Sequence, residues 1–162
     1  MSVTNGNSAV ANFENGGRVL IETAASTYLN ILNISGGSMS MEIGRRRVVP
    51  FNDRNVIQPP RLGEQLPSKV KMKVKATSAY ASGEIMKLLL PIPSNDTAAA
   101  IKIHVEIPTY AGASTGIRWT FTKAVVDRPI PFNGGTDFDE WDLNFTDYAE
   151  IAEPTAYTSA LS

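Results

Sequence analysis

Apolar and polar residues alternate along seven short segments of the chain, which is the pattern of half-buried β-strands. The clearest segment is SKVKMKVKA at residues 68–76, where valine and methionine occupy one face and lysine the other. The predicted strands cover residues 18–22, 28–34, 38–43, 68–76, 99–107, 116–126 and 138–148. Residues 28–34 could also line a helix face, but their β-branched and aromatic content and the glycine pair that follows favour a strand.

The same alternation assigns side chains to an inner and an outer face of the predicted sheet. The inner positions are Met39, Met41, Ile43, Val70, Met72, Val74, Ala76, Ile101, Ile103, Val105, Ile107, Ile117, Trp119, Phe121, Trp141, Leu143 and Phe145. The outer positions are Lys69, Lys71, Lys73, Lys75, Lys102, His104, Glu106, Glu140, Asp142, Asn144 and Thr146. The turn at residues 112–116 predicts a β-hairpin, and the alternation breaks at Lys123-Ala124, where we expect a bulge or bend.

One helix is predicted over residues 82–90. Ser82 is a suitable N-cap, Glu84 stands in the first turn, and Pro91 ends the helix. The apolar side of this helix comprises Ile85, Met86, Leu88 and Leu89. We expect that side to pack against the sheet.

Residues 44–67 show neither a helical nor a strand period. Prolines and a glycine punctuate this basic stretch at positions 50, 59, 60, 63 and 67. A segment of this length without regular structure is uncommon inside a domain and tends to be functional. We therefore expect a long extended loop that serves a purpose outside the core.

The two ends differ in composition from the middle of the chain. Residues 1–17 are polar and rich in glycine and asparagine, without the basic and apolar regions of a secretory signal, so we expect a flexible arm. Residues 151–162 are small and polar, and we expect a tail that frays or docks on a neighbour. Between them, residues 18–150 predict a mainly β fold, a single β-sandwich or barrel-like domain with one flanking helix.

Composition excludes several kinds of chemistry. The chain has no cysteine and only one histidine, His104, so thiolate sites and multi-histidine metal sites are excluded within one chain. The absence of cysteine also fits synthesis in a reducing cytoplasm. His104 is expected on the polar face of a strand, as an ordinary surface residue. The glycines form no phosphate-binding fingerprint. The sequence also contains no run of about 20 apolar residues, the length that a membrane-spanning helix requires.

The acidic residues Asp137, Asp139, Glu140 and Asp142 could suggest a glycosidase pair or a calcium loop. Trp141 interrupts the alternation that a calcium loop requires, so a solvated acidic strand edge is favoured. We therefore predict no catalytic residue, no cofactor and no bound metal.

Charge is strongly divided along the chain although the formal net charge is only −1. Residues 45–75 contain nine basic and two acidic residues, a balance of +7, and residues 127–153 contain eight acidic residues and one arginine, a balance of −7. The two blocks could complement another copy of the chain or neutralise each other within one subunit, and both alternatives remain open. The lysine ladder of residues 69–75 could contact phosphates, but without interleaved aromatic residues a solvated face or subunit contact is favoured.

The order of these elements resembles the tail tube proteins of tailed bacteriophages, which are related to the inner tubes of contractile injection machines. The resemblance rests most on GIRWTFTKAVVDRPIPFNGGTDFDEWDLNFTDYAE, residues 116–150, where a strand ending in F-x-K-A-V precedes an acid-rich D-x-W-x-L-x-F strand. It implies a structural virion protein, made in the host cytoplasm, whose hexameric rings stack into the conduit for DNA ejection. The implied partners are further copies of the chain and the tape measure, terminator and distal tail proteins, with DNA passing through unbound.

If the chain is such a tube subunit, its own charge pattern suggests roles for two sets of residues. The candidate contacts between subunits and rings are Arg45, Arg46, Arg47, Arg54, Arg61, Asp137 and Asp139. The candidate lumen-facing residues are Glu140, Asp142 and Asn144, since a DNA conduit is expected to repel phosphates. The alternatives are a capsid decoration or cement protein and, from a different class, an enzyme or carbohydrate-binding module.

Overall fold

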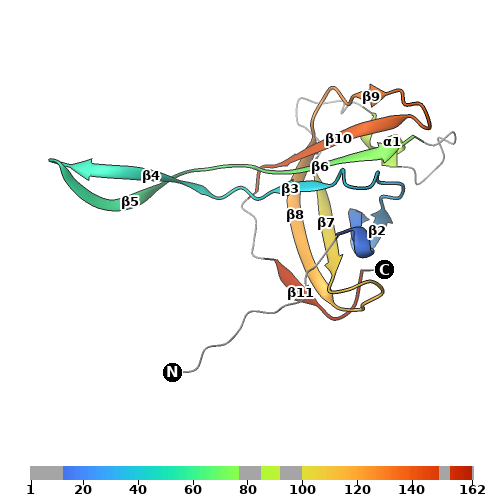
Figure 1. The fold of residues 1–162 in the computed structure, drawn as a ribbon, viewed down its shortest axis with the longest axis horizontal. Helices are drawn as coiled ribbons and strands as arrows, with labels where there is room; N and C mark the ends of the chain where they lie inside the picture. The colour runs from blue at the N-terminus through green and yellow to red at the C-terminus, as the bar shows by residue number, and fades with distance from the viewer. Residues whose placement is uncertain (1–12, 77–84, 92–99, 150–153, 162) are drawn as a thin grey trace.

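In the computed structural model, which describes residues 13–76, 85–91, 100–149 and 154–161, a strongly bent antiparallel sheet forms the body and a two-stranded hairpin projects far from it (Figure 1). The body strands are β1 (Arg18–Ala24), β2 (Thr27–Asn30), β3 (Ser40–Glu42), β6 (Ser68–Lys75), β7 (Ile101–Pro108), β8 (Gly116–Val126), β9 (Phe132–Asn133), β10 (Glu140–Asp147) and β11 (Thr155–Tyr157). The projecting strands are β4 (Arg46–Asp53) and β5 (Val56–Gln65), and the helices are the short 3-10 turn η1 (Phe13–Asn15) and α1 (Ile85–Leu89). The mainly β fold class is confirmed.

The body sheet runs in the order β2-β1-β7-β8-β10-β6-β3, and β8 is its pivot. The 11 residues of β8 pair with β7 on one side; on the other side, β11 pairs with the beginning of β8 and β10 with its end. The chain that leaves β2 crosses to the far edge, where Ile34 forms a bridge with Val74 of β6. The amide of Ser35 donates to the carbonyl of Lys73 at 2.8 Å. The sheet thus closes on itself in the manner of a barrel.

Most of the predicted inner face forms the core, but two assignments were wrong: Ile117, predicted inward, is 41% exposed, and Thr146, predicted outward, is buried, where it donates a hydrogen bond to Asp127. Side chains at alternate positions of β1, β6, β7, β8 and β10 are almost completely buried, as the alternation requires. The core cluster consists of Val19, Ile21, Ile31, Val70, Met72, Val74, Ile85, Met86, Leu89, Ile103, Val105, Phe121, Ala124, Leu143 and Phe145. The predicted bulge is also confirmed, because the register between β7 and β8 shifts between Phe121 and Ala124.

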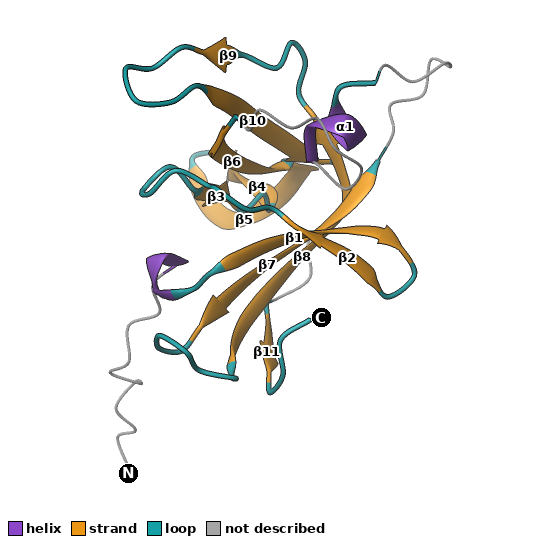
Figure 2. Cartoon of the chain, turned by 90° about the vertical axis from the view of Figure 1, so that its right-hand side faces the viewer, coloured by secondary structure: helices purple, strands orange, loops and turns teal. Residues whose placement is uncertain are grey.

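Helix α1 covers one end of this core (Figure 2), and residues 85–89 of the predicted helix are confirmed as helical. Ile85, Met86 and Leu89 are buried, but Leu88 is 44% exposed, so its assignment to the apolar face was wrong. Along the described part of the helix, Ile85, Met86 and Leu89 form one stripe that faces the core, and Leu88 falls outside it. The guanidinium of Arg128 donates to the carbonyls of Leu89, Leu90 and Pro91 at 2.6, 3.3 and 2.9 Å, which satisfies the C-terminal end. Ser82 and Glu84 lie outside the described residues.

The segment expected to lack regular structure, residues 44–67, contains the hairpin of β4 and β5, and this is the main correction to the predicted fold. The register shifts twice along the hairpin, once where Pro50 lies opposite Pro59 and Pro60 and once beside Gly63. Residues that cannot extend a regular ladder are thus gathered at two bulges. The tip is a turn with positive φ at both central residues, Arg54 and Asn55, the geometry that suits a two-residue hairpin connection.

The ends of the domain also differ from expectation. Part of the expected N-terminal arm has regular structure, since residues 13–17 form a turn in which Phe13 packs against the core. The tail contains a strand, β11, that pairs with β8 of its own chain instead of fraying. Residues 1–12 and 150–153 lie outside the described part of the chain. The strand count is accordingly higher than the seven that alternation predicted.

Gly44 determines how the chain enters the hairpin, and we predict that Gly44→Ala destabilises the protein. A Cβ at this position would lie 2.0 Å from the carbonyl oxygen of Leu66. The backbone that enters the hairpin at Gly44 and the backbone that leaves it at Leu66 would therefore have to separate. We expect a loss of about 1–3 kcal/mol in unfolding free energy, measured by urea denaturation. Gly134→Ala is the matched control, because the nearest atom is 3.6 Å away, and it is expected to change stability by less than about 0.5 kcal/mol. Equal effects of the two substitutions would contradict this role.

Candidate functional site

The hairpin arm, defined here as residues 46–65, exposes large apolar side chains along its length. The exposed fraction is 87% for Ile57, 64% for Leu62 and 59% for Val48. None of the residues that pack in the core cluster comes from this arm. A two-stranded hairpin on its own is only marginally stable in water, so an apolar arm of this kind gains stability by docking on another surface.

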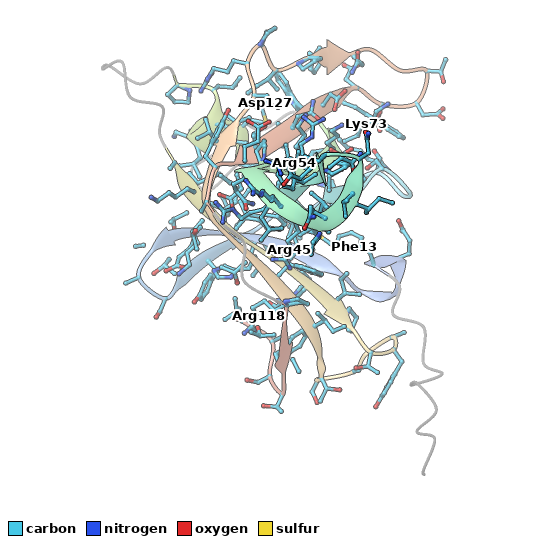
Figure 3. The ribbon with its side chains drawn as sticks, turned by 90° about the vertical axis from the view of Figure 1, so that its left-hand side faces the viewer. Phe13, Arg45, Arg54, Lys73, Arg118 and Asp127 are labelled. Atoms are coloured by element: carbon cyan, nitrogen blue, oxygen red, sulfur yellow. The ribbon has the colours of Figure 1, made fainter. Side chains whose placement is uncertain are left out.

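All five candidate contact arginines lie on the arm or at its base. Arg54 marks the tip, as Figure 3 shows end-on, and the guanidinium of Arg61 lies 4.0 Å from the ring centroid of Phe51. Arg46 and Arg47 are exposed on β4, and Arg45 directly precedes that strand. The arm is therefore both apolar and cationic.

The structure does not bring the acidic candidates to this arm. Asp137 and Asp139 lie in the exposed connection between β9 and β10, at the opposite end of the molecule from the arm in Figure 1. The arginines of one chain are thus not neutralised by these two carboxylates of the same chain. Contact between the two groups requires a second copy.

The lysine ladder, in contrast, lies beside acidic residues of its own chain. Strands β6 and β10 are neighbours, and their register places Lys75 opposite Glu140, Lys73 opposite Asp142 and Lys71 opposite Asn144. Two of the four lysines, Lys75 and Lys73, thus face a carboxylate of the same chain, whereas Lys71 and Lys69 face the neutral residues Asn144 and Thr146. The candidate lumen-facing residues consequently share their face with lysines, and this face is not purely negative.

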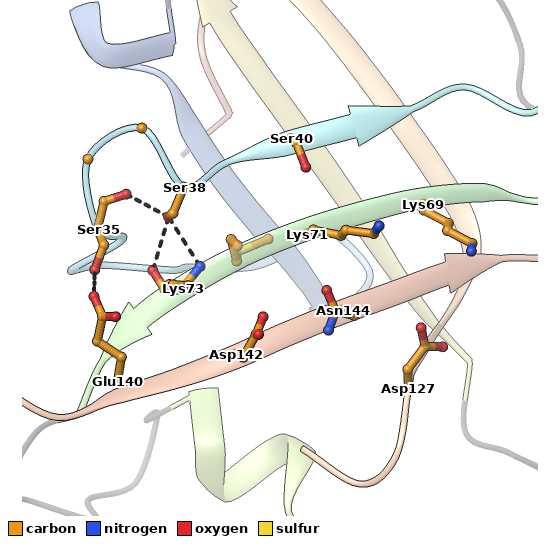
Figure 4. Close-up of a pocket in the computed structure, with 13 residues that line it drawn as sticks. Ser35, Ser38, Ser40, Lys69, Lys71, Lys73, Asp127, Glu140, Asp142 and Asn144 are labelled. Carbon is orange, nitrogen blue, oxygen red and sulfur yellow. Dashed lines mark hydrogen bonds between the residues drawn. The ribbon is translucent and has the colours of Figure 1, made fainter. Parts of the chain in front are cut away.

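This face is hollowed into an open groove of about 860 Å³, which we call the β6–β10 groove (Figure 4). The loop of residues 35–38 forms one wall, where the hydroxyl of Ser35 donates to Glu140 and the hydroxyl of Ser38 donates to the carbonyl of Ser35 at 2.6 Å. Asp127 accepts a hydrogen bond from Thr146 at 2.9 Å. The hydroxyls of Ser35 and Ser38 are committed to a carboxylate and a backbone acceptor, so neither is set up as a nucleophile.

His104 was expected to be exposed, and this expectation was wrong, since only 6% of it is accessible. Its Nε2 lies 3.1 Å from Glu22 and its Nδ1 lies 3.1 Å from the hydroxyl of Thr120. Hydrogen bonds from His104 and Lys102 lower the pKa of Glu22, so this carboxylate is ionised at neutral pH and can only accept. The imidazole therefore carries its hydrogen on Nε2 when neutral.

A hydroxyl, an imidazole and a carboxylate in a row resemble the order of a hydrolytic triad. The neighbouring groove of about 390 Å³ is lined by Glu22, Lys102 and Thr122 but not by Thr120 or His104. A substrate in that groove would not reach the hydroxyl. The three groups satisfy one another's hydrogen bonds on the outer face of β1, β7 and β8, and we assign them a structural role.

A second buried polar cluster was also missed by the alternation, which placed Glu106 outward. Glu106 is 1% exposed and accepts hydrogen bonds from Arg18 at 3.1 Å and Arg118 at 3.4 Å. The backbone amide of Leu161 donates to the same carboxylate at 3.2 Å. The chain's own C-terminal residues cover this part of the outer face, which explains why an apparently outward position is buried.

Comparisons with known proteins do not extend these assignments. No protein-family model matches the chain, and no curated protein is significantly similar to it in sequence. Within the part of the chain that the structure describes, no group of three or more metal-ligating side chains could hold an ion. Among the described helices, none is long and apolar enough to cross a membrane.

The arm is expected to be dispensable for folding of the body. Arg46 and Gln65 are cross-strand partners, so residues 47–64 can be replaced by an Asn-Gly turn that joins these two directly. Because the arm contributes nothing to the core cluster, we expect the thermal midpoint to fall by less than about 3 °C, roughly 1 kcal/mol for a domain of this size. Loss of cooperative unfolding in circular dichroism would show that the arm belongs to the folding unit.

Glu106→Ala is predicted to destabilise the protein by about 3–5 kcal/mol, because Arg18 and Arg118 would be left without their buried counter-ion. The control is Glu64→Ala, which removes an exposed glutamate from the arm and is expected to cost less than about 0.5 kcal/mol. Urea unfolding monitored by tryptophan fluorescence measures both. A loss below 1 kcal/mol for Glu106→Ala would mean that the cluster is solvated.

Proposed function

We propose that this chain is a structural virion protein, a tail tube subunit that assembles into stacked hexameric rings forming the conduit for DNA ejection. The observation that carries the proposal is the hairpin arm, which extends from the body with exposed apolar side chains. These side chains do not pack against the core cluster of the same chain. The mainly β body and the resemblance of residues 116–150 to tail tube proteins support the same function. The protein would be made in the host cytoplasm and would act in the phage tail.

The arm supplies the affinity in this proposal. Complete burial of one valine, leucine or isoleucine contributes roughly 1.5–3 kcal/mol, so burial of Val48, Val56, Ile57 and Leu62 contributes on the order of 10 kcal/mol. Val56 and Ile57 are adjacent in β5 and point to opposite faces, so this value requires cover on both faces of the arm. Association of two proteins costs an estimated 4–15 kcal/mol in lost freedom of motion. A single arm contact is therefore weak, whereas a closed ring, in which every subunit both gives and receives an arm, is stable.

Electrostatic contacts between copies have a smaller role. The arginines of the arm and the acidic pair Asp137 and Asp139 lie at opposite ends of one molecule, an arrangement suited to head-to-tail contact between copies. Each exposed pair contributes only about 0–1 kcal/mol and is screened beyond about 8–10 Å at physiological salt. We infer that these charges direct the register and rate of assembly.

The β6–β10 groove is proposed to face the lumen, with Glu140, Asp142 and Asn144 among its surface residues. Lysines lie beside these residues on β6, so the face carries cations and anions in neighbouring rows. Such a surface offers DNA no continuous basic patch, which suits a conduit through which phosphates pass without being held. The proposed partners are further copies and the tape measure, terminator and distal tail proteins.

Negative-stain electron microscopy of the purified, concentrated protein tests the proposal. We expect six-fold rings or tubes for the wild type and neither for an Ile57→Lys/Leu62→Lys variant, because two charges on the arm cannot be buried without partners. Leu88→Lys is the matched control, since Leu88 is an exposed leucine outside the arm, and it should assemble like the wild type. Three-fold particles would indicate a capsid decoration or cement protein instead, and a monomer at every concentration would contradict both functions.

A further inference from the structure

The C-terminal segment, defined here as residues 154–161, occupies a shaped site on the body. Strand β11 extends the edge of β8, with Ala156 paired to Ile117 and Tyr157 paired to Gly116. Strand β10 pairs only with residues 124–126 of β8, so the beginning of this edge is open to another strand. This is the arrangement by which a sheet binds an extended peptide.

The site recognises two features of the segment. The first is Tyr157, which is 7% exposed. The guanidinium carbon of Arg118 lies over the tyrosine ring, 5.0 Å from the ring centroid. Gly116 leaves room for it, because a Cβ there would lie 2.6 Å from the tyrosine hydroxyl. Burial and the nearby charge of Glu106 raise the pKa of Tyr157, so the phenol enters this slot uncharged.

The second feature is the main chain of the last residues. Arg18 donates to the carbonyl of Leu161 at 2.8 Å, Arg118 donates to the carbonyl of Ser159 at 3.2 Å, and the amide of Leu161 donates to Glu106. Figure 3 places Arg118 beside β11 on the body. Arg18, Glu106 and Arg118 together form what we call the Glu106 clamp, which binds backbone atoms of Ser159 and Leu161 beyond the bend at residues 158–159.

The segment itself has little apolar surface to hold it in place. Its residues other than Tyr157 are exposed or only partly buried, so the hydrophobic contribution comes chiefly from one side chain. Its remaining attachment is by hydrogen bonds that water can replace, with a net contribution of about 1 kcal/mol for each bond between neutral groups and roughly 1.5–3 kcal/mol for each bond to Arg18, Arg118 or Glu106. Such a strand can detach while the core of the body stays intact.

We propose that β8 and the Glu106 clamp form a strand-exchange site, in which the C-terminal segment of one copy binds β8 of a neighbouring copy. The contacts are identical whichever copy supplies the segment, so exchange costs nothing in binding free energy and links the two copies. The five peptide units from Ala149 to Pro154 reach at most about 18 Å, so the exchange partner is a subunit in direct side-by-side contact. The side-by-side contact that this exchange requires rests on the self-assembly proposed above.

The local concentration of binding sites determines whether the segment binds β8 of its own copy or β8 of a neighbouring copy. A segment tethered to its own body has an effective concentration of the order of millimolar, so the dilute protein keeps it in place. Subunits packed side by side present a neighbouring site at a comparable local concentration. We therefore expect the segment to stay on its own chain in dilute solution and to exchange in the assembled state.

Disulfide trapping with an Ile117→Cys/Ala156→Cys variant tests this inference. Both residues are exposed, they are direct cross-strand partners, and the chain has no native cysteine. Paired residues of antiparallel strands have Cα atoms about 4.5–5.5 Å apart, within the range that a disulfide spans. Oxidation of the dilute variant should give only an internally bonded monomer, and oxidation after concentration and assembly should give a ladder of covalent multimers on a denaturing gel.

The controls separate exchange from chance collision and from the proposed function. Ser114→Cys/Ala156→Cys, which pairs the tail cysteine with an exposed loop residue, should give no ladder. Adding Tyr157→Ala to the trapping variant should weaken the ladder, whereas adding Thr155→Ala should not. Tubes that contain only internally bonded chains would overturn the exchange and leave the tail tube function standing. A ladder without rings or tubes would support the exchange and contradict the tube, and no ladder at any concentration would overturn the exchange.

Discussion

The rest of the structure depends on the eight-residue ladder between β6 and β10. Its register, from Ser68 opposite Asp147 to Lys75 opposite Glu140, buries Val70, Met72 and Val74 on the inner face. On its other edge β6 receives β3 and the bridge from Ile34, which closes the sheet. A shift of one residue would turn the inner face outward, so the apolar alternation of β6 fixes the core, the closure and the base of the arm together.

The chain divides its apolar residues between two tasks. Those of the body are buried against one another and give a closed unit without the arm. Those of the arm are exposed in the single chain, although the arm has a regular ladder of its own. The arm residues add length to the chain but no buried apolar area to the monomer. Their exposure is physically reasonable if a second surface covers the arm. An arm that folds before it docks also loses less conformational freedom on binding than a disordered loop would.

Alternation predicted most of the inner face of the body, because each strand is buried on one side by its own sheet, but it was wrong at Ile117, near the start of β8. It failed at His104 and Glu106, since the cover on their face comes from residues distant in sequence, Glu22 and the C-terminal segment. It failed at the arm for a different reason. Pro50, Pro59, Pro60 and Gly63 erase the period of two locally, and only the paired register shows that they meet at shared bulges. An Arg-Asn turn is also a weaker hairpin signal than Asn-Gly.

The divided charge of the chain has two physical meanings that the sequence alone could not separate. Two of the four lysines of β6 face a carboxylate of β10 at neighbouring-strand distance, so this part of the charge is partly offset within the subunit. The arginines are carried away from the body on the arm, beyond the reach of screened interactions with the acidic loop at the far end. This second part is placed to act between molecules. Since each such pair contributes little, in the proposed assembly the apolar residues of the arm would supply the affinity, and the charges would select the orientation of docking.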